Sequence, residues 1–458
     1  MKKLLFLIVL AMVFAFSIKD RAEMSLSQFY VEGMMSRNLE LSATRINNLD
    51  CQECYDDVNY PEMREWAKAG VENGVGIPTN TVVFTTTSAT NTSGLQIDID
   101  NANAQYITSD TIQVVLITAN TDITLATTLN MKDGVVLRGM DRQTSRLVVD
   151  GITYTSGNNQ GSVYFGNGVE YAGLENLSIY YEPNHPCQPK DDLTQPSITQ
   201  DFPTTRKNGG TDLATATTLE NCNTNGGTPG VGSLIRTFGV KIDLEAHNNW
   251  LYQIDIDKMA SHPIDLHGDN NEIREVFINR TFNKGTGGNG YITIRGRKNL
   301  IINNTFQRLR HITIDNRRNS GGDESVYNVL WGNTLFRVDV NFHDGVAEFV
   351  LVENNNIWPD FDVNHCQGDP FNKGSSDSGH TPTGDSNIAY KNDISQSGNP
   401  SQWDFNTVYV TNTSISAGGC DATIFDIDPR GAPPCGTFYL GASGGAITNS
   451  GLTLIKQH

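Results

Sequence analysis

The chain of 458 residues carries 33 basic and 51 acidic residues, which gives a formal net charge of -18. A protein this acidic lacks the broad basic surface that nucleic acids and anionic membranes require, so we expect neither as a partner. With 38% hydrophobic and 18% charged residues, the chain can bury a large core and is not disordered by composition.

The first residues, MKKLLFLIVLAMVFAFS, have the pattern of a secretory signal. Two lysines precede an apolar run from Leu4 to Phe16, and the small residues Ala15 and Ser17 lie near its end. The run is shorter than the ~18 residues that a membrane span needs, so an uncleaved anchor is the weaker alternative. We therefore expect residues 1–17 to be removed and the protein to be secreted, to the extracellular or periplasmic space, with no membrane contact afterwards.

Export is consistent with the seven cysteines, because disulfides persist in oxidising compartments. Spacing alone does not determine how they pair. Pairing neighbours along the chain would join Cys51 to Cys54, Cys187 to Cys222 and Cys420 to Cys435, and would leave Cys366 over.

Residues 18–85 lack the strand pattern of the later sequence. Within them, YPEMREWAKAGVENGVGIP at residues 60–78 begins as a helix and ends in glycine. We interpret 18–85 as a capping segment, because the end of a stacked β fold has an unpaired edge that needs covering. Residues 182–233 are rich in Thr, Asn, Gly and Pro, and we expect a long side loop there.

A short repeat organises residues 86–458: two apolar residues separated by four others. The steps between successive repeats from residue 251 onward are 22, 28, 29, 22, 37, 21 and 37 residues. A minimum close to 22 with loop-sized additions is typical of stacked coils. The pairs are Leu251/Ile256, Ile273/Ile278, Ile301/Phe306, Leu330/Leu335, Val352/Ile357, Ala389/Ile394, Val410/Ile415 and Ile447/Leu452.

Four successive repeats carry an asparagine two residues before the second apolar position. Stacked asparagines at one corner of a coil can hydrogen-bond along the stack as an amide ladder. Together with runs of Val, Ile and Thr broken by Gly, Asn and Asp, this pattern predicts an all-β fold, a single right-handed parallel β-helix. A β-sandwich is the competing fold, but it gives no reason for the repeated residues Asn304, Asn333, Asn355 and Asn392.

Two upstream stretches, ITLATTLNMKDGVVLRGM at 123–140 and VEYAGLENLSIYY at 169–181, look like opening coils. They resemble the pectate-lyase-like superfamily of secreted right-handed β-helix proteins, and the resemblance covers roughly residues 75–458. It implies the fold and leaves the activity open, because the superfamily holds lyases, glycoside hydrolases, esterases, epimerases and tailspikes. The sequence lacks the motifs of polygalacturonases and of classical pectate lyases, so no site residues carry over.

Candidate site residues come from the strand that follows each repeat, in segments such as GYITIRG and RHITIDN. Period-2 alternation turns the apolar residues inward and stacks the others in outward rows, with about 4.8 Å between strands. A slip of two residues near Val338–Phe342 would put Asn341 in place of Asp339. The expected rows are Tyr291, His311, Arg337; then Asp265, Thr293, Thr313, Asp339, Asp362; then His267, Arg295, Asp315, Asn341, Asn364, with His343 one step beyond.

This face predicts an enzyme that cleaves an acidic, uronate-containing polysaccharide by β-elimination. Arg295 and Arg310 would neutralise the substrate carboxylate, His311 would be the base, and His343 or Tyr291 the acid. Between Arg295 and Arg318 seven basic residues face one acid, which favours an acidic substrate. The other expected substrate-binding residues are His267, Asp265, Asn341 and Arg337. A calcium ion held by Asp265, Asp339 and Asp362 is the one cofactor considered.

Two alternatives remain open at this point. An inverting glycoside hydrolase would use Asp315 and Asp339, about 8 Å apart if the register slips. A non-catalytic glycan-binding β-helix would use the same face without cutting. In each case we expect a monomer.

Overall fold

We analysed a computed structural model of the chain, which forms two compact units, residues 1–49 and 50–458. The first unit, the predicted signal, the loop at 182–233 and all seven cysteines lie outside the described residues. Those described are 62–66, 68–71, 83–149, 161–181, 238–259, 262–281, 290–307, 309, 311–315, 325–336, 338–343, 347–358, 371–373, 387–390, 392–395, 408–416 and 425–426.

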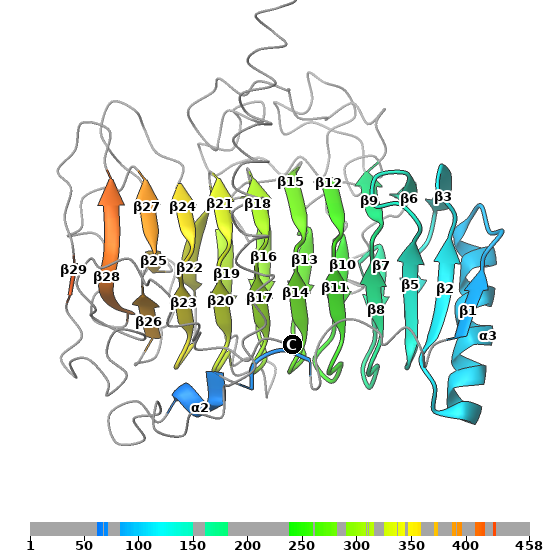
Figure 1. Ribbon diagram of the computed structural model, residues 1–458, viewed down its shortest axis with the longest axis horizontal. Helices are drawn as coiled ribbons and strands as arrows, with labels where there is room; N and C mark the ends of the chain where they lie inside the picture. The colour runs from blue at the N-terminus through cyan, green and yellow to red at the C-terminus, as the bar shows by residue number, and fades with distance from the viewer. Residues whose placement is uncertain are drawn as a thin grey trace, which may run out of the picture. The chain divides into compact units, whose positions relative to one another are not determined.

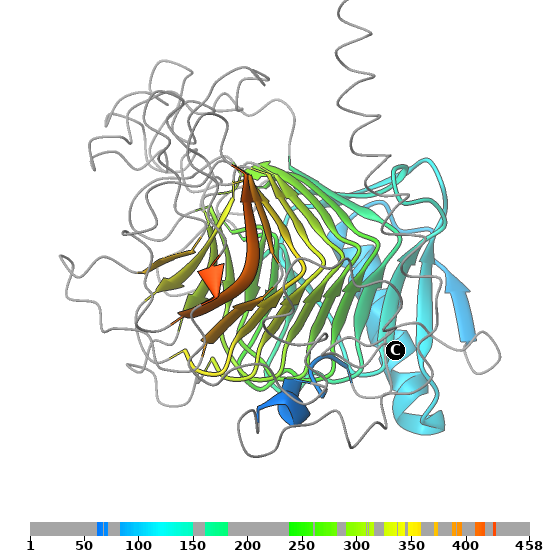
Figure 2. The ribbon, with the colours of Figure 1, turned by 60° about the vertical axis from the view of Figure 1, so that its left-hand side comes forward.

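Unit 50–458 is a right-handed parallel β-helix, as predicted. Each coil contributes one strand to each of three sheets, A, B and C, and equivalent strands of successive coils pair in parallel (Figures 1 and 2). The predicted apolar pairs are in register: Leu251 stands opposite Ile273, and Ile256 opposite Ile278, and the pattern continues to Val410 and Ile415. The last predicted pair, Ile447/Leu452, lies outside the described residues.

The strands are listed here by sheet. Sheet A contains β1 (Val83–Thr86), β2 (Gln113–Ile117), β5 (Val135–Gly139), β8 (Gly173–Glu175), β11 (Trp250–Tyr252), β14 (Glu272–Arg274), β17 (Leu300–Ile302), β20 (Val329–Trp331), β23 (Leu351–Glu353) and β26 (Asn387–Tyr390). Sheet B contains β3 (Thr121–Leu125), β6 (Ser145–Val149), β9 (Ser178–Tyr181), β12 (Asp255–Met259), β15 (Phe277–Thr281), β18 (Thr305–Gln307), β21 (Thr334–Phe336), β24 (Asn356–Trp358) and β27 (Asp393–Ser395). Sheet C contains β4 (Leu129–Asn130), β7 (Val163–Phe165), β10 (Val240–Ile242), β13 (Ile264–Leu266), β16 (Tyr291–Ile294), β19 (His311–Asp315), β22 (Asp339–His343) and β25 (Phe371–Lys373). Strand β28 (Val408–Ser416) joins sheets A and B, and β29 (Phe425–Asp426) pairs with it antiparallel.

The predicted asparagine ladder occupies the corner between sheets A and B. In Asn333, Nδ2 donates to Oδ1 of Asn355 at 2.9 Å and to the carbonyl of Ile301 at 2.9 Å, and the same pattern runs from Asn304 to Asn392. The preceding residue is left-handed, for example Asn303 with φ 55° or Gly332 with φ 65°, which turns the chain sharply. The buried amide groups of these four coils are thereby satisfied.

A second ladder, which we did not predict, holds the corner between sheets C and A. Backbone N–H groups of Asn249 and Asn271 donate to the Oδ1 atoms of Asn271 and Asn299, each at 2.9 Å, and Asn299 donates in the same way to Asn328. Here too a left-handed residue comes first, such as Asn248 with φ 56°. Both corners therefore combine a left-handed residue with an asparagine whose Oδ1 accepts a hydrogen bond from the neighbouring coil.

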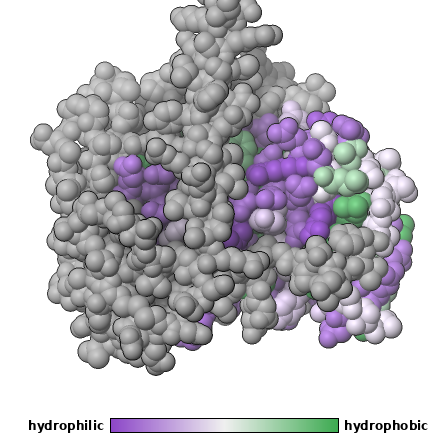
Figure 3. All heavy atoms as spheres, in the orientation of Figure 1, coloured by the Kyte–Doolittle hydropathy of each residue, from purple (hydrophilic) through white to green (hydrophobic). Residues whose placement is uncertain are grey.

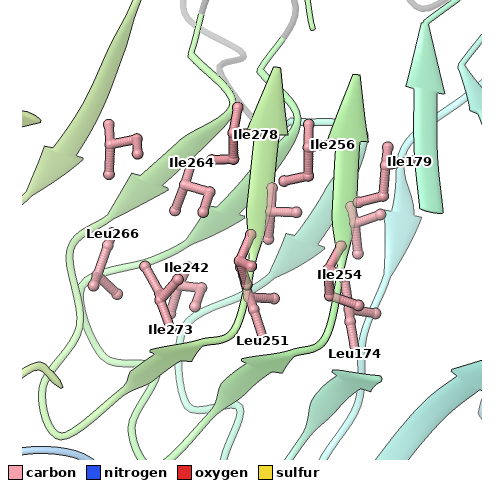
Figure 4. Packing of buried hydrophobic residues seen from close by; sticks show 14 of the residues in the cluster. Leu174, Ile179, Ile242, Leu251, Ile254, Ile256, Ile264, Leu266, Ile273 and Ile278 are labelled. Atoms are coloured by element: carbon pink, nitrogen blue, oxygen red, sulfur yellow. The ribbon is translucent and has the colours of Figure 1, made fainter. Parts of the chain in front are cut away.

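The core consists of inward-facing Ile, Leu and Val from all three sheets, stacked coil on coil (Figure 4). Helix α3 (Thr92–Ser109) adds Leu95, Ile99 and Ala102 to it and packs against β2, β3, β4 and β5 (Figure 1). The side chain of Asn91 caps the helix by accepting from the N–H of Gly94 at 3.0 Å. Thus the helix that covers the first coils lies inside the region that we had assigned to coils, 86–458.

Within the predicted capping segment, residues 62–66 and 68–71 cover the side of the coils and not their end, and we call them the strap. It contains α2 (Met63–Trp66) and lies against the outer face of sheet A. Its Gly70 N–H donates to the carbonyl of Lys298 at 2.8 Å, and Trp66 Nε1 donates to the carbonyl of Phe349 at 2.5 Å. Strand β1, also within 18–85, belongs to sheet A itself. None of the helices in the described ranges is both long and apolar enough to cross a bilayer.

Candidate functional site

The outward face of sheet C carries the predicted site residues in three rows, with one correction. Tyr291 pairs with His311 and His311 with Asp339, so Asp339 belongs to the first row. Of the two registers left open by the sequence, the structure has the one in which Asn341, and not Asp339, stands beside Thr313. Val338, Val340 and Phe342 are all inward, and their alternation fits either register equally well. His343 accordingly stands opposite Asp315 in the third row.

His311 and Asp339 form a hydrogen-bonded pair at the start of strands β19 and β22. The bond joins His311 Nδ1 to Asp339 Oδ1, and both side chains keep some exposure, 12% and 17%. A proton on Nδ1 leaves the lone pair on Nε2, and Nε2 has no hydrogen bond to any of the described residues. The Tyr291 ring lies 5.0 Å from the His311 ring, centroid to centroid. This arrangement suits a general base with its orienting carboxylate.

The third row, together with Asp265 of the middle row, forms a chain of polar and charged groups. His267 Nε2 lies 3.0 Å from Asp265 Oδ1 and 2.9 Å from Arg295 Nη1, and Arg295 Nη2 donates to Asp315 Oδ2 at 3.1 Å. One nitrogen cannot donate to Asp265 and accept from Arg295 at once, so the position of the His267 proton decides which contact is a hydrogen bond. Burial alone would raise the pKa of Asp265, but His267 and Arg295 outweigh it and hold that pKa well below its usual value.

The middle row is buried although it faces away from the core. Thr293, Thr313 and Asn341 are register partners and are 3%, 1% and 5% exposed. Thr313 Oγ1 and Asn341 Oδ1 have no hydrogen-bond partner among the described residues. Buried polar atoms in this state mark a place where water or a ligand group binds.

The register does not bring two of the predicted sets together. Asp315 and Asp339 are four residues apart along adjacent strands, or about 14 Å between Cα atoms, well beyond the separation of about 6.5–9.5 Å used by an inverting pair. Asp265 and Asp339 are three strands and two residues apart, about 16 Å between Cα atoms. The described side chains contain no group of three or more His, Cys, Asp or Glu residues arranged to hold a metal ion. Arg310, Arg337, Asp362 and Asn364 lie outside the described residues, as does the side chain of His343.

The basic stretch that begins at Arg295 is partly neutralised within the protein. Arg295 is paired with Asp315, and Lys298 Nζ lies 2.5 Å from Glu65 Oε2 of the strap. The remaining basic residues of the stretch, apart from Arg297, lie outside the described residues. The surplus of positive charge in the sequence is therefore smaller on the folded surface.

The sequence analysis missed a third cluster on this face, Tyr164, Lys241 and Asp243. Tyr164 and Lys241 are register partners on β7 and β10, and Lys241 is in turn the partner of Asp265. The Tyr164 hydroxyl donates to Asp243 Oδ2. Burial, and then this bond, raise the pKa of Tyr164. The sequence analysis missed this cluster because residues 182–237 lie between β9 and β10 of the same coil. The repeat pattern is therefore interrupted before β10, the strand that carries Lys241.

Charged pairs also lie on other parts of the described surface, for example Arg138 and Glu175 on sheet A. On the face shown in Figure 3, the described residues are mainly hydrophilic, with small apolar patches. The exposed pair Arg146–Asp122, joined across β6 and β3 at 2.6 Å, is an example of ordinary surface charge.

Comparisons with known proteins identify no family. No family model and no curated protein matches the chain. Solved structures that resemble it include the tailspike protein of an Acinetobacter phage, with TM-score 0.38 and 10% identity over 83% of this chain and 68% of that one. Others are the pectin methylesterase of Erwinia chrysanthemi, with TM-score 0.35 and 10% identity over 76% and 92%, and a surface adhesin of Streptococcus pneumoniae, with TM-score 0.35 and 10% identity over 78% and 80%. Because these TM-scores and sequence identities are low, the fold is assigned from the strand pairings of this chain and not from the similar structures.

Proposed function

We propose that this protein is a secreted carbohydrate-active enzyme that cleaves an acidic polysaccharide by β-elimination, with His311 as the base. The observation that carries the proposal is the His311–Asp339 pair on the outer face of sheet C. A carboxylate at Nδ1 fixes the tautomer and favours the imidazolium that forms when Nε2 takes a proton.

In this reaction Nε2 removes the proton α to a uronate carboxylate. The electron pair of that C–H bond forms the new double bond, the bond to the leaving sugar oxygen breaks, and that oxygen receives a proton. Tyr291, next to His311, is the proposed acid, because His343 stands four residues from Asp339 on β22, about 14 Å from His311 between Cα atoms. The atoms balance without a co-reactant.

The substrate carboxylate needs a cation or strong donors nearby. Arg295 already has Asp315 as its counter-ion, so binding a carboxylate there requires exchange of one partner for another. We therefore assign the main neutralising role to Arg310, the residue directly before His311, and a supporting role to Arg295. Calcium at Asp265, Asp339 and Asp362 is not favoured, because the first two lie three strands apart.

The test is to incubate the purified protein with a panel of uronate-containing polysaccharides and to follow the ultraviolet absorbance of the unsaturated product. We expect absorbance to rise on one polymer, to be lost in His311→Ala and to survive in His247→Ala, a histidine on the turn after β10. A chelator arm tests for a metal. Reducing ends without absorbance would contradict elimination in favour of hydrolysis, and no product from any polymer would favour a binding protein.

A further inference from the structure

We propose that Tyr164 and Lys241 form a binding subsite for an anionic sugar unit, three strands from His311 on the same face. The inference rests on the proposed function, because it assumes that the ligand is an acidic glycan. It names a part of the face to which the sequence assigns no role, on strands β7 and β10.

The Tyr164 ring is held in a fixed position. Its hydroxyl is bound to Asp243, and ring carbon Cε1 lies 3.1 Å from the point where a Cβ on Gly166 would be, so the ring lies across this glycine. Any larger residue at 166 would press on the ring. A half-buried aromatic ring fixed at both ends offers an apolar surface for a sugar ring at little entropic cost.

The Lys241 ammonium has charge to offer. Among the described residues its one ion-pair partner is Asp243, whose Oδ1 lies 3.9 Å from Nζ, and Asp243 also accepts from the Tyr164 hydroxyl and from the N–H of Leu244 at 2.9 Å. Among the described residues no acceptor is hydrogen-bonded to Lys241 Nζ, although its side chain is only 14% exposed. A largely buried ammonium with unused donors is suited to an anionic partner from outside.

The neighbouring acid does not cancel this charge. Asp265, the register partner of Lys241, directs Oδ1 to His267 Nε2 at 3.0 Å and makes no ion pair with Lys241. Arg295, the other described cation of the face, has Asp315. A linear polymer running along the rows from β19 reaches β10 after three strands, about 14 Å.

The experiment measures binding rather than cleavage. In a His311→Ala background, which keeps polymer intact, calorimetry compares Lys241→Met with Lys68→Met, a lysine on the strap that changes the net charge equally. The probes are the uronate polymer that the protein binds most tightly and the same polymer with its carboxyls reduced to alcohols. Circular dichroism verifies that each variant is folded.

We expect Lys241→Met to weaken binding of the uronate polymer by about tenfold or more, the scale of one charge-assisted hydrogen bond, and to leave the reduced polymer unaffected. Tyr164→Phe should weaken the uronate polymer too, because it frees Asp243 to pair with Lys241. The subsite would be overturned if Lys241→Met and Lys68→Met bound the uronate polymer with equal affinity. It would also be overturned if Lys241→Met lost as much affinity for the reduced polymer as for the uronate polymer. The experiment measures binding and not cleavage, so it tests the subsite even if the protein does not cleave the polymer by elimination.

Discussion

The outer faces of sheets A and C are built on the same coils and yet differ in what covers them. Sheet A has two outward rows. One is almost wholly apolar, with Glu272 as its charged member, and is buried; the strap lies on it at Leu300, where a Cβ on Gly70 would lie 3.1 Å from Leu300 Cβ. The other row carries charged side chains such as Arg138, Glu175 and Arg274. On sheet C the outward rows are polar and charged. The apolar row consists of Val136, Gly173, Trp250, Glu272, Leu300, Val329, Leu351 and Ile388.

Two carboxyls on successive strands show the contrast. Asp265 on β13 and Glu272 on β14 are both buried, at 5% and 0% exposure. The pKa of Asp265 is lowered by His267 and Arg295 in spite of burial. The pKa of Glu272 is raised by burial, which Arg274 and the N–H of Val71 only partly oppose. The difference teaches that burial alone does not set the direction in which the pKa of a carboxyl moves, because the neighbouring cations decide whether burial is outweighed.

The largest expected effect is a loss of activity when His311 on sheet C is replaced. His311→Ala should lower the rate on the preferred polymer by about 10²–10⁴-fold, the usual contribution of a general base. Some unfolding free energy should be lost too, because the side chain is only 12% exposed, is bound to Asp339 and lies beside the Tyr291 ring, so the rate is compared per folded molecule. Initial rates and denaturant unfolding of the same preparation measure both. A stability loss as large as the activity loss would give His311 a structural role.

Sheet A should respond in the opposite way. Leu300→Ala removes a fully buried side chain beneath the strap and should cost about 2–5 kcal/mol of unfolding free energy, whereas activity per folded molecule stays constant. Leu300→Met, which keeps the volume, is the matched control and should cost less than about 1.5 kcal/mol. Denaturant midpoints give the measurement. If Leu300→Ala reduced activity at full folding, the strap face would belong to the functional surface.

The coil repeat could be predicted because it depends on local chemistry. Leu251, Ile273 and Ile301 recur at coil spacing, and asparagines such as Asn333 leave a buried amide that only stacking satisfies. The register around Asp339 could not be predicted, because period-2 alternation is unchanged by a shift of two residues. It depends on the length of the preceding loop, and loop length is not encoded in the strand pattern.

Contacts between residues far apart in the chain could not be predicted, because neither segment carries a pattern that identifies its partner. Trp66, for example, donates a hydrogen bond to the carbonyl of Phe349, 283 residues away. The Tyr164–Asp243 bond spans 79 residues that include a long insertion. Helix α3 was missed because its outward Ile97 and Ile107, 60% and 74% exposed, blur the helical pattern of apolar residues.

The smallest expected effect is a difference in pH dependence between the two buried carboxyls. The unfolded chain ionises Glu272 near its ordinary 4.5, but the fold holds the proton to higher pH. The unfolding free energy should therefore fall as pH rises above 4.5 toward the raised value, and Glu272→Gln should remove that fall. For Asp265 the sign is reversed: its ionised form stabilises the fold above its ordinary 3.8, and this contribution is lost as pH falls below that value.

Denaturant unfolding between about pH 3 and 8 resolves the two carboxyls in one series, with the exposed Glu245→Gln as the control for a lost charge. Glu272→Gln should flatten the curve only above 4.5, and Asp265→Asn only below 3.8. Glutamine retains the contacts to Arg274 and Val71, so a flattened curve reflects the proton and not lost packing. An unchanged slope above 4.5 in Glu272→Gln would mean that Arg274 and Val71 outweigh burial, and that the two faces treat a buried carboxyl alike.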